Sequence, residues 1–381
     1  MLLVSMVLVA SACGGADDAS GSAPTGAAGR DATSDAAVPA DAGSASAGAY
    51  PDLSGRTITV TSSGGELAVA ERTAYWEPFE ELTGASIEVV EVDYSTLPTN
   101  LLAQVDAGDV EWDLISGLAP SDAIRLGEKG ALQSLPLDDI PGLADLAEGT
   151  YFAYGVANEV DAWYTTYSLR DGVEPLTGAA DFFDPSIVGP RSAAGSSAVA
   201  NINCAIALVA DGVAPEDIAP IDVPRCLSVW DRIKDQVTVW WGSGSEMAQT
   251  LIDDSVDYCI CLDGRTLQAM KTNPEWGFSH RGAEIVLSYL SVAKDSPNLD
   301  IALELIDFTT KAEQQAKFVE LLGYSGPNPN AVDFLPDELK PFLSTTPENR
   351  DVTFQPTPEQ DAILADNADD VARAWDEWIS Q

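Results

Sequence analysis

The sequence predicts an α/β protein of two lobes, each a mostly parallel sheet flanked by helices, joined by two hinge crossings. β-prone runs and helical runs alternate along most of the chain, which favours parallel strands covered by helices. Of the 381 residues, those after position 50 exceed the roughly 250–300 that one core usually supports. Two extended runs lie close together in mid-sequence and another returns later, as expected of a chain that crosses twice between lobes.

The chain opens on an apolar run that ends at Cys13, MLLVSMVLVASAC. This run is shorter than the about 20 residues that a helix needs to cross a bilayer, and small residues before a cysteine suit cleavage and lipid attachment. We expect residues 1–13 to be a lipoprotein signal with Cys13 as the lipid-attachment site; an ordinary hydrophobic terminus is the alternative. Residues 14–54 are expected to be a flexible linker, because Gly, Ala, Ser and Asp bury too little apolar surface to offset the entropy of ordering.

The first lobe is expected to begin with a strand at 57–61 and a glycine-containing turn at 62–65. An amphipathic helix then ends near Gly84, with Trp76 in its core-facing stripe. A strand at 87–92 and a helical stretch, LPTNLLAQVDAGD, come next. A short apolar strand at 112–115 and a loop and helix in SGLAPSDAIRLGEKGAL complete this β-α alternation. In such sheets ligands bind at the loops that follow the carboxyl ends of the strands.

Two extended runs, 151–156 and 162–167, are expected to form the first crossing. The second lobe then alternates again over about 171–281, and the run AEIVLSYLSVAKDS returns the chain to the first lobe. The expected elements of the second lobe are helices at 198–210 and 225–234, a strand at 237–240, a helix from Ser245 and a strand at 256–261.

Three helices are expected after the return strand. Ser296 should cap the first, with Pro297 at its start. Thr310 and Glu313 fit a capping box for the second, which Gly323 should close. The final helix spans 357–381 and carries Ile363, Leu364, Val371, Trp375 and Trp378.

The charge balance excludes several classes of partner. The chain carries 61 acidic and 19 basic residues, a net charge of −42. Such a field repels nucleic acid and anionic lipid headgroups. A salt-adapted surface and ordinary acidic helix faces are alternative explanations of this composition.

Catalytic motifs are missing from the sequence. His280 is its one histidine, so a Ser-His-Asp triad or a multi-histidine metal site has a single imidazole available. GxSxG, GxGxxG, Walker and HExxH motifs do not occur. We therefore expect no catalytic residues, no cofactor and no metal, and a structural role for His280 near a strand end.

The four cysteines after Cys13 are an even number in an oxidising compartment, which predicts one or two disulfides among Cys204, Cys226, Cys259 and Cys261. Cys259 and Cys261 lie two apart on one face of an expected strand, where we expect poor geometry for a bond between them. A Cys204–Cys226 bridge, links from both of these to the strand pair, and a zinc site remain open.

Four stretches resemble a known family: SSGGELAVAERTAYWEPFEELTG, YTTYSLRDGVEPLTGAADFFDPSIVGPRS, VWWGSGSEMAQTLIDDSVDYCICLDGR and ALELIDFTTKAEQQAKFVELLGYSGPNPNA. They are similar to the extracellular solute-binding proteins of ABC importers, within the branch that includes spermidine/putrescine-binding proteins. The resemblance implies a two-lobed periplasmic-binding-protein fold (type II) that closes on a small organic solute and delivers it to membrane permease subunits. It implies lobe 1 at 55–158 and 285–328, lobe 2 at 159–284 and 329–381, and a membrane-tethered monomer.

The sequence departs from the polyamine branch at two places. CLDGR stands where WNGR is typical, so that Leu262 replaces a tryptophan. Val286, Leu287 and Ser288 stand where a tryptophan and an aspartate are expected. A polyamine, a smaller amine, an amino acid and a related organic solute therefore all remain candidate ligands. A sensor subunit and a non-transport enzyme on the same fold are the alternative functions.

The candidate ligand residues lie at expected cleft edges. Backbone N–H groups in the strand-to-helix corners suit an anionic or polar group. Asp263 suits an ammonium group, with Arg265 as its partner or as a carboxylate clamp; a surface ion pair is the alternative. Of Trp240 and Trp241, strand alternation should turn one toward the cleft. The predicted ligand-binding residues are Ser62, Ser63, Gly64, Gly65, Ser116, Gly117, Trp163, Tyr164, Trp241, Ser243, Ser245, Asp263 and Arg265.

Overall fold

The computed structural model of the protein describes residues 50–94 and 96–381. The expected signal at 1–13, with Cys13, and most of the expected linker lie outside the described residues. Within the described part of the chain, no helix has the length and apolar character needed to span a membrane.

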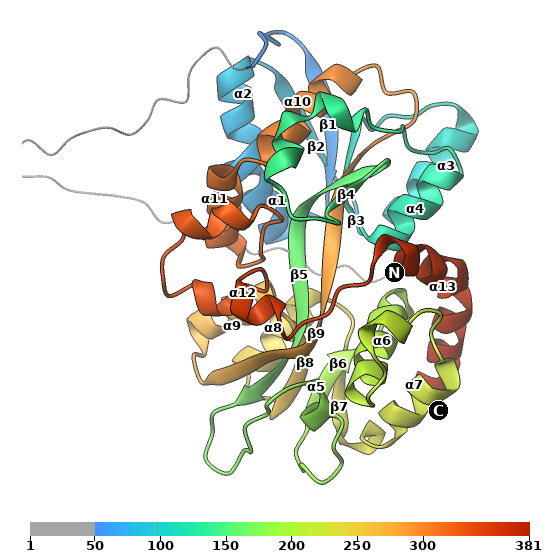
Figure 1. Ribbon diagram of the computed structural model, residues 1–381, viewed down its shortest axis with the longest axis vertical. Helices are drawn as coiled ribbons and strands as arrows, with labels where there is room; N and C mark the ends of the chain where they lie inside the picture. The colour runs from blue at the N-terminus through green and yellow to red at the C-terminus, as the bar shows by residue number, and fades with distance from the viewer. Residues whose placement is uncertain (1–49, 95) are drawn as a thin grey trace, which may run out of the picture. The chain divides into compact units, whose positions relative to one another are not determined.

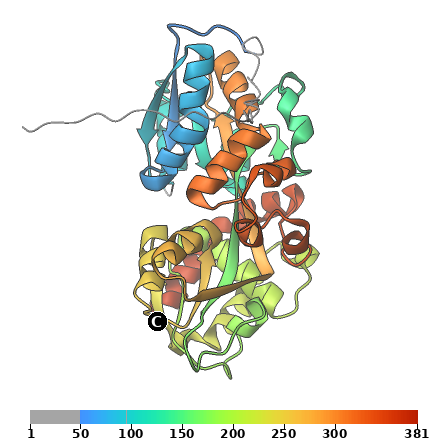
Figure 2. The same cartoon turned by 90° about the vertical axis from the view of Figure 1, so that its left-hand side faces the viewer.

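One mixed sheet runs through the described fold in the order β2-β1-β3-β9-β5-β8-β6-β7. Its centre is an antiparallel pair of long strands, β5 (Gly155–Ser168) and β9 (Trp276–Val292), which enter both lobes (Figures 1 and 2). β3 pairs with β9 on the side of lobe 1, and β8 pairs with β5 on the side of lobe 2. The α/β architecture with two crossings is confirmed.

Lobe 1 forms around a parallel strand trio in which β1 lies between β2 and β3. Its core includes Tyr75, Trp76 and Phe79, which are fully buried, so the predicted helical stripe is confirmed. Gly84 closes this helical stretch with φ 75°, a left-handed conformation that glycine adopts without strain. The elements of lobe 1 are β1 (Thr57–Ser62), α1 (Gly65–Glu71), a π-helical turn (Arg72–Trp76), α2 (Glu77–Thr83), β2 (Ser86–Glu91), α3 (Leu97–Ala107), β3 (Leu114–Leu118), α4 (Pro120–Glu128), β4 (Tyr151–Phe152), α10 (Leu299–Thr309) and α11 (Ala312–Leu322).

Lobe 2 has a parallel trio in which β6 lies between β7 and β8. Its core holds a cluster of tryptophans: the Trp230 ring lies 5.5 Å from Trp375, and the Trp240 ring lies 5.8 Å from Trp378. The C-terminal helix α13 therefore packs on this lobe. The elements are α5 (Ala179–Phe182), β6 (Arg191–Ala194), α6 (Ala200–Ala210), α7 (Val223–Asp231), β7 (Val237–Trp241), α8 (Gly244–Ile252), β8 (Tyr258–Leu262), α9 (Asp263–Thr272), α12 (Pro347–Arg350) and α13 (Pro358–Ile379).

The first crossing differs from the expectation. We expected two separate runs at 151–156 and 162–167, but β5 is continuous over Gly155–Ser168. The strand continues through the polar residues Asn158, Glu159 and Asp161 because β9 pairs with this stretch, Glu159 opposite Ser288 and Asp161 opposite Val286.

Two expected helix caps are wrong. α10 begins at Leu299 with Asn298 as its cap, and the Ser296 hydroxyl instead donates to Asp113 Oδ1 at 2.6 Å. α11 begins at Ala312 without a side-chain cap, because the Thr310 hydroxyl donates to the Asp307 carbonyl at 2.6 Å. The expected closure at Gly323 is confirmed by its φ of 90°.

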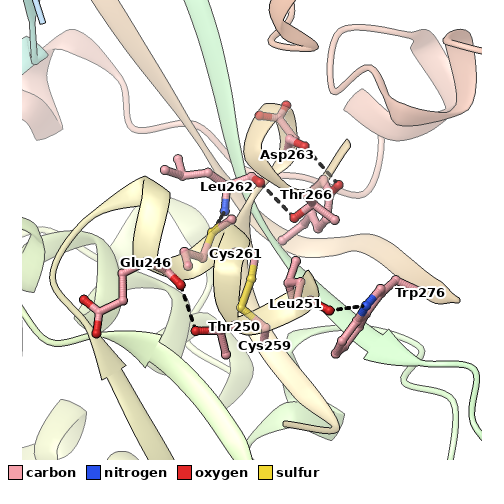
Figure 3. Close-up of a disulfide and its surroundings, with 11 residues drawn as sticks. Glu246, Thr250, Leu251, Cys259, Cys261, Leu262, Asp263, Thr266 and Trp276 are labelled. Carbon is pink, nitrogen blue, oxygen red and sulfur yellow. Dashed lines mark hydrogen bonds between the residues drawn. A yellow bond between two sulfur atoms is a disulfide. The ribbon is translucent and has the colours of Figure 1, made fainter. Parts of the chain in front are cut away.

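The cysteines form two disulfides, Cys204–Cys226 and Cys259–Cys261. The second corrects our expectation of poor geometry: the two Cα atoms are 5.5 Å apart, within the usual range for a bridge. It lies in β8 next to α8 and α9 (Figure 3). Links between the two pairs and a zinc site on these sulfurs are therefore wrong.

His280 lies inside β9 and not near a strand end as we expected, because β9 begins earlier, at Trp276. Its ring is buried, with Nε2 3.3 Å from the Phe342 carbonyl oxygen. Burial lowers the pKa of His280 to about 4, so the imidazole is neutral near pH 7. Its surroundings are those of a core histidine.

Candidate functional site

A cavity of about 320 Å³ lies between the lobes, which is within the usual size range of small-molecule sites. Lobe 1 contributes the loop before α3 and the start of α4. Lobe 2 contributes the start of α6 and one face of α13, and the hinge strand β9 lies between them (Figure 1). The residues that line the cavity include Tyr94, Ser121, Asp122, Arg125, Asn201, Glu284, Val286, Gln355, Asp361 and Asp369.

Two helices begin at this cavity. α4 starts at Pro120 after the extended residue Ala119, and α6 starts at Ala200 after a 3-10 turn at Ser197–Val199. The first backbone N–H groups of a helix have no carbonyl partner within it. Both helix starts line the cavity, but the turn before α6 already uses its N–H groups, since Val199 donates to the Ser196 carbonyl and Ala200 to the Ser197 carbonyl. The start of α4 therefore offers backbone donors to an anionic or polar group of a ligand from the side of lobe 1.

Two carboxyl groups, Glu284 buried and Asp361 partly buried, face the same cavity. The Glu284 side chain on β9 is 4% exposed, and its Oε2 has no hydrogen-bond partner among the described residues. Burial, reinforced by the charge of Asp361, raises the pKa of Glu284 well above its usual range. Asp361, in the first turn of α13, has its pKa raised to about 7 by burial.

Of the described residues that line the cavity, Arg125 carries the one basic side chain. It lies on α4 and forms a 2.7 Å ion pair with Asp122, one turn earlier. Both side chains are partly exposed. The cavity therefore offers acidic groups beside the hinge and lobe 2, and a cation on the side of lobe 1.

The predicted lobe 1 residues come together through Glu71. Its buried carboxyl accepts hydrogen bonds from the Ser62 and Ser116 hydroxyls, each at 2.5 Å. Burial raises the pKa of Glu71 to about 7 against these two hydrogen bonds, which lower it. Ser63 lies beside Gly117. Gly64 and Gly65 have positive φ, as the sharp turn from β1 into α1 requires, and Gly117 has positive φ within β3. These residues do not line the cavity, and their role in binding stays a prediction.

The predicted lobe 2 residues have partners inside the lobe. The Trp163 and Trp241 rings stack, and Trp240 packs on the opposite side with Trp230. Both Trp240 and Trp241 thus have core partners and neither lines this cavity, so contact of Trp241 with a ligand stays a prediction.

The other predicted residues of lobe 2 also have local roles. Ser243 caps α8 by accepting from the Glu246 N–H at 3.2 Å, and Ser245 is exposed in the first turn of that helix. The Tyr164 hydroxyl donates to the Asp263 carbonyl at 3.4 Å.

Asp263 is fully buried at the start of α9 and belongs to an acidic group at the hinge with Glu159 and Asp161. Its Oδ1 accepts from the Gly264 N–H at 2.8 Å, and its Oδ2 has no partner among the described residues. Arg265 does not pair with Asp263: it reaches Glu66 of lobe 1 at 3.4 Å. Asp263 does not line the cavity, so its predicted contact with an ammonium group stays untested.

Asp263, Glu246 and Cys261 are the candidate acid, base or nucleophile of an enzyme on this fold, and they do not converge on one point. The Cys261 sulfur is bonded to Cys259, and the Glu246 carboxylate accepts from the Gly242 N–H at 2.8 Å. Figure 3 shows the Glu246 carboxylate directed away from Asp263. Among the described residues, no group of three or more His, Cys, Asp or Glu side chains is placed to hold a metal ion.

Sequence reasoning missed the residues that line the cavity, Glu284 and Asp361 above all. For Glu284 a signal existed: it is a lone carboxylate inside the apolar run AEIVLSYLSV. Asp361 carries no such signal, because it is one of many acidic residues in α13. Only the packing of α13 on lobe 2 shows that Asp361 lies in the cavity with Glu284.

Comparisons with known proteins show which family the chain resembles in sequence and structure. The family model for bacterial extracellular solute-binding proteins matches residues 74–349. A gamma-aminobutyric acid-binding protein of Pseudomonas aeruginosa is 28% identical over 300 residues, 77% of this chain and 83% of that protein.

Two solved structures share the fold over nearly their whole length. The Agrobacterium tumefaciens R10 protein AgtB, in complex with agropinic acid, is 27% identical with a TM-score of 0.71, covering 86% of this chain and 99% of that one. An ABC transporter substrate-binding protein of Bradyrhizobium japonicum USDA 110 is 26% identical with a TM-score of 0.76, covering 85% and 99%. Because the family model spans most of its length, the chain belongs to the bacterial extracellular solute-binding proteins and is an extracytoplasmic binding protein, not an enzyme.

Proposed function

We propose that this protein is the solute receptor of an ABC importer, which captures a small organic solute between its lobes and delivers it to a membrane permease. The observation that carries the proposal is the cavity, because both lobes and the hinge strand β9 contribute to its walls. A solute there contacts both lobes at once. The similarity to an ABC transporter substrate-binding protein supports the importer as the partner.

The mechanism is a shift between open and closed arrangements of the lobes. Two long strands, β5 and β9, connect the lobes, and bending them changes the width of the cleft. A ligand that contacts both lobes binds the closed arrangement more tightly and so raises its population. The permease then recognises the closed form. No bond in the solute is made or broken.

An amino-acid-like solute fits the cavity better than a polyamine. Two of the relatives named above bind gamma-aminobutyric acid or agropinic acid, and the start of α4 and Arg125 suit a carboxylate. A polyamine has no carboxylate and leaves these donors unused. The position where the polyamine branch has a tryptophan holds Val286 here. We therefore place the spermidine/putrescine assignment second.

The proposal includes a lipid anchor at Cys13 and a monomeric state. A tether of Gly, Ala, Ser and Asp between 14 and 54 would let the receptor reach a permease in the same membrane. Metabolic labelling with a fatty-acid probe, comparing the wild type with Cys13→Ser, tests the anchor. Light scattering of the purified protein tests the monomer.

A thermal-shift screen with amino acids, γ-amino acids, opines, polyamines and sugars tests the receptor function. A bound solute at hundredfold excess over its Kd should raise the melting temperature by about 5 °C or more. Small-angle scattering with the same solute should show a smaller radius of gyration. No shift with any class of solute would contradict the proposal.

A further inference from the structure

We propose that Glu284, Asp361 and Asn201 form a subsite for a primary ammonium group at the hinge end of the cavity. The inference rests on the proposed function and names the class of solute, a primary amine. It also identifies the groups that select for it. The sequence had indicated Asp263 for this role, which does not line the cavity.

Two of the three acceptors are buried without a partner. Glu284 Oε2 and Asn201 Oδ1 are both inaccessible to solvent and unpaired among the described residues. Leaving such buried atoms unpaired is unfavourable to the free energy of the folded protein. The Asn201 amide is fixed in orientation, because its Nδ2 donates to the Leu364 carbonyl at 3.3 Å. Both residues line the cavity, where a ligand with N–H donors satisfies them.

The fold brings the three side chains together from three elements. A parallel bridge pairs Glu284 with Phe354, only a few residues before α13 begins. Asp361 lies three residues before Leu364 and thus on the same face of α13. Leu364 is the residue whose carbonyl holds Asn201. The short connection places the start of α13 beside β9, and the bond from Asn201 places α6 against both.

The chemistry of these groups matches a primary ammonium. An R–NH₃⁺ group has three N–H donors in a compact point charge, and the subsite has three oxygen acceptors. Without a cation, a buried carboxyl group and a partly buried one beside it avoid ionisation, as the raised pKa of Asp361, about 7, reflects. An ammonium pairs with both and restores their charge at neutral pH. A quaternary ammonium has no N–H donors and leaves the acceptors unsatisfied.

Calorimetric titration of the full chain tests the subsite. The probes are 4-aminobutanoate and butane-1,4-diamine as primary amines, and butanoate and 4-(trimethylammonio)butanoate as analogues without N–H donors. 4-Aminobutanoate should bind about tenfold to hundredfold more tightly than butanoate and 4-(trimethylammonio)butanoate, its analogues without N–H donors. Glu284→Gln and Asp361→Asn should each lose a similar factor.

Two exposed residues provide matched controls. Glu275→Gln makes the same change just before β9, and Asp366→Asn makes the same change on the outer face of α13. Both should keep the wild-type affinity. Because Glu284 and Asp361 resist ionisation in the free protein, their amide variants should also keep the wild-type melting temperature, which separates loss of binding from loss of fold.

The outcomes separate this inference from the receptor function. If solutes without an amine bind as tightly as the amines, or if Glu284→Gln and Asp361→Asn leave amine affinity unchanged, the ammonium subsite is wrong while the receptor stands. If no primary amine binds but another class of solute shifts the melting temperature, the inference is again overturned alone. If no solute of any class binds, both proposals fail.

Discussion

The indole rings of Trp163 and Trp241 stack with their centroids 5.5 Å apart and their planes inclined by 28°. Trp163 lies on the hinge strand β5, and Trp241 ends β7 at the far side of the lobe 2 sheet. Both rings are buried. The pair therefore connects the hinge strand to the core of lobe 2, and the predicted contact of these two residues with a ligand stays a prediction.

Trp241→Ala should destabilise the protein by about 3–5 kcal/mol, because it removes a buried aromatic side chain and leaves a cavity. Urea denaturation monitored by far-ultraviolet circular dichroism, which reports on the backbone, measures the change in unfolding free energy. Phe334→Ala is the control, since Phe334 is 51% exposed. A loss below about 1 kcal/mol for Trp241→Ala would show that the ring contributes little to the core.

Glu71→Gln should change how stability depends on pH. The pKa of Glu71 is raised to about 7 in the folded protein from 4.5. Its contribution to stability is therefore full below about pH 4.5 and is lost as pH rises to about 7. Between pH 5 and pH 8 the wild type should lose about 2–3 kcal/mol relative to the variant.

The exposed residue Glu320 provides the control for this measurement. Glu320→Gln should follow the wild type at both pH values in chemical denaturation. A constant difference between Glu71→Gln and the wild type across the range would mean that Glu71 ionises normally in the folded protein.

Much of the fold was predictable because local patterns agree with the tertiary structure. β1, α6 and α13 were expected within a few residues of their actual bounds, since each has clear periodicity and α13 also has a cap at Thr357. The continuous strand β5 was not predictable, because the polar residues at its centre are paired only by β9, which lies more than a hundred residues away.

The site was less predictable than the fold. The strand-to-helix corners were identified correctly as turns, but Ser62 and Ser116 bind Glu71 inside lobe 1. Sequence gives no measure of how a buried carboxyl competes with a ligand for these hydroxyls. Asp361 lies far along the chain from Glu284, and only the packing of α13 brings the two into one cavity.

Gly264→Ala should weaken solute binding because it destabilises the closed arrangement of the lobes. A Cβ at Gly264 would lie 2.5 Å from the buried Tyr324 ring, where α9 of lobe 2 meets lobe 1. Overpacking costs about 1–3 kcal/mol. If the cost falls on the closed arrangement, affinity drops by about 5-fold to 100-fold.

Gly242→Ala is the control for this change, because a Cβ there meets its nearest neighbour at 3.7 Å. Calorimetry with a solute identified in the thermal-shift screen gives the affinities, and scattering gives the radius of gyration. Unchanged affinity and radius in Gly264→Ala would show that this contact does not accompany closure.

The affinity for a primary amine should rise with pH through neutrality. Burial raises the pKa of Asp361 to about 7 and that of Glu284 well above its usual range. The titratable and charged groups that surround the two carboxyls are Tyr289 on β9, Asp122 and Arg125 on α4, Asp369 on α13 and Tyr94 in the loop before α3. The ammonium binds the ionised carboxyls, so protons compete with it below pH 7. Affinity should fall by up to about tenfold per unit below that pH, with proton release measured by calorimetry in buffers of different ionisation enthalpy. A flat profile in the wild type would contradict this.

A crystal structure of the protein with the solute that gives the greatest thermal shift tests the central claim most directly. The account predicts electron density for the solute in the cavity between α4, α6 and α13, in contact with both lobes and with β9. Density for the solute on one lobe alone, or on an outer surface, would contradict it.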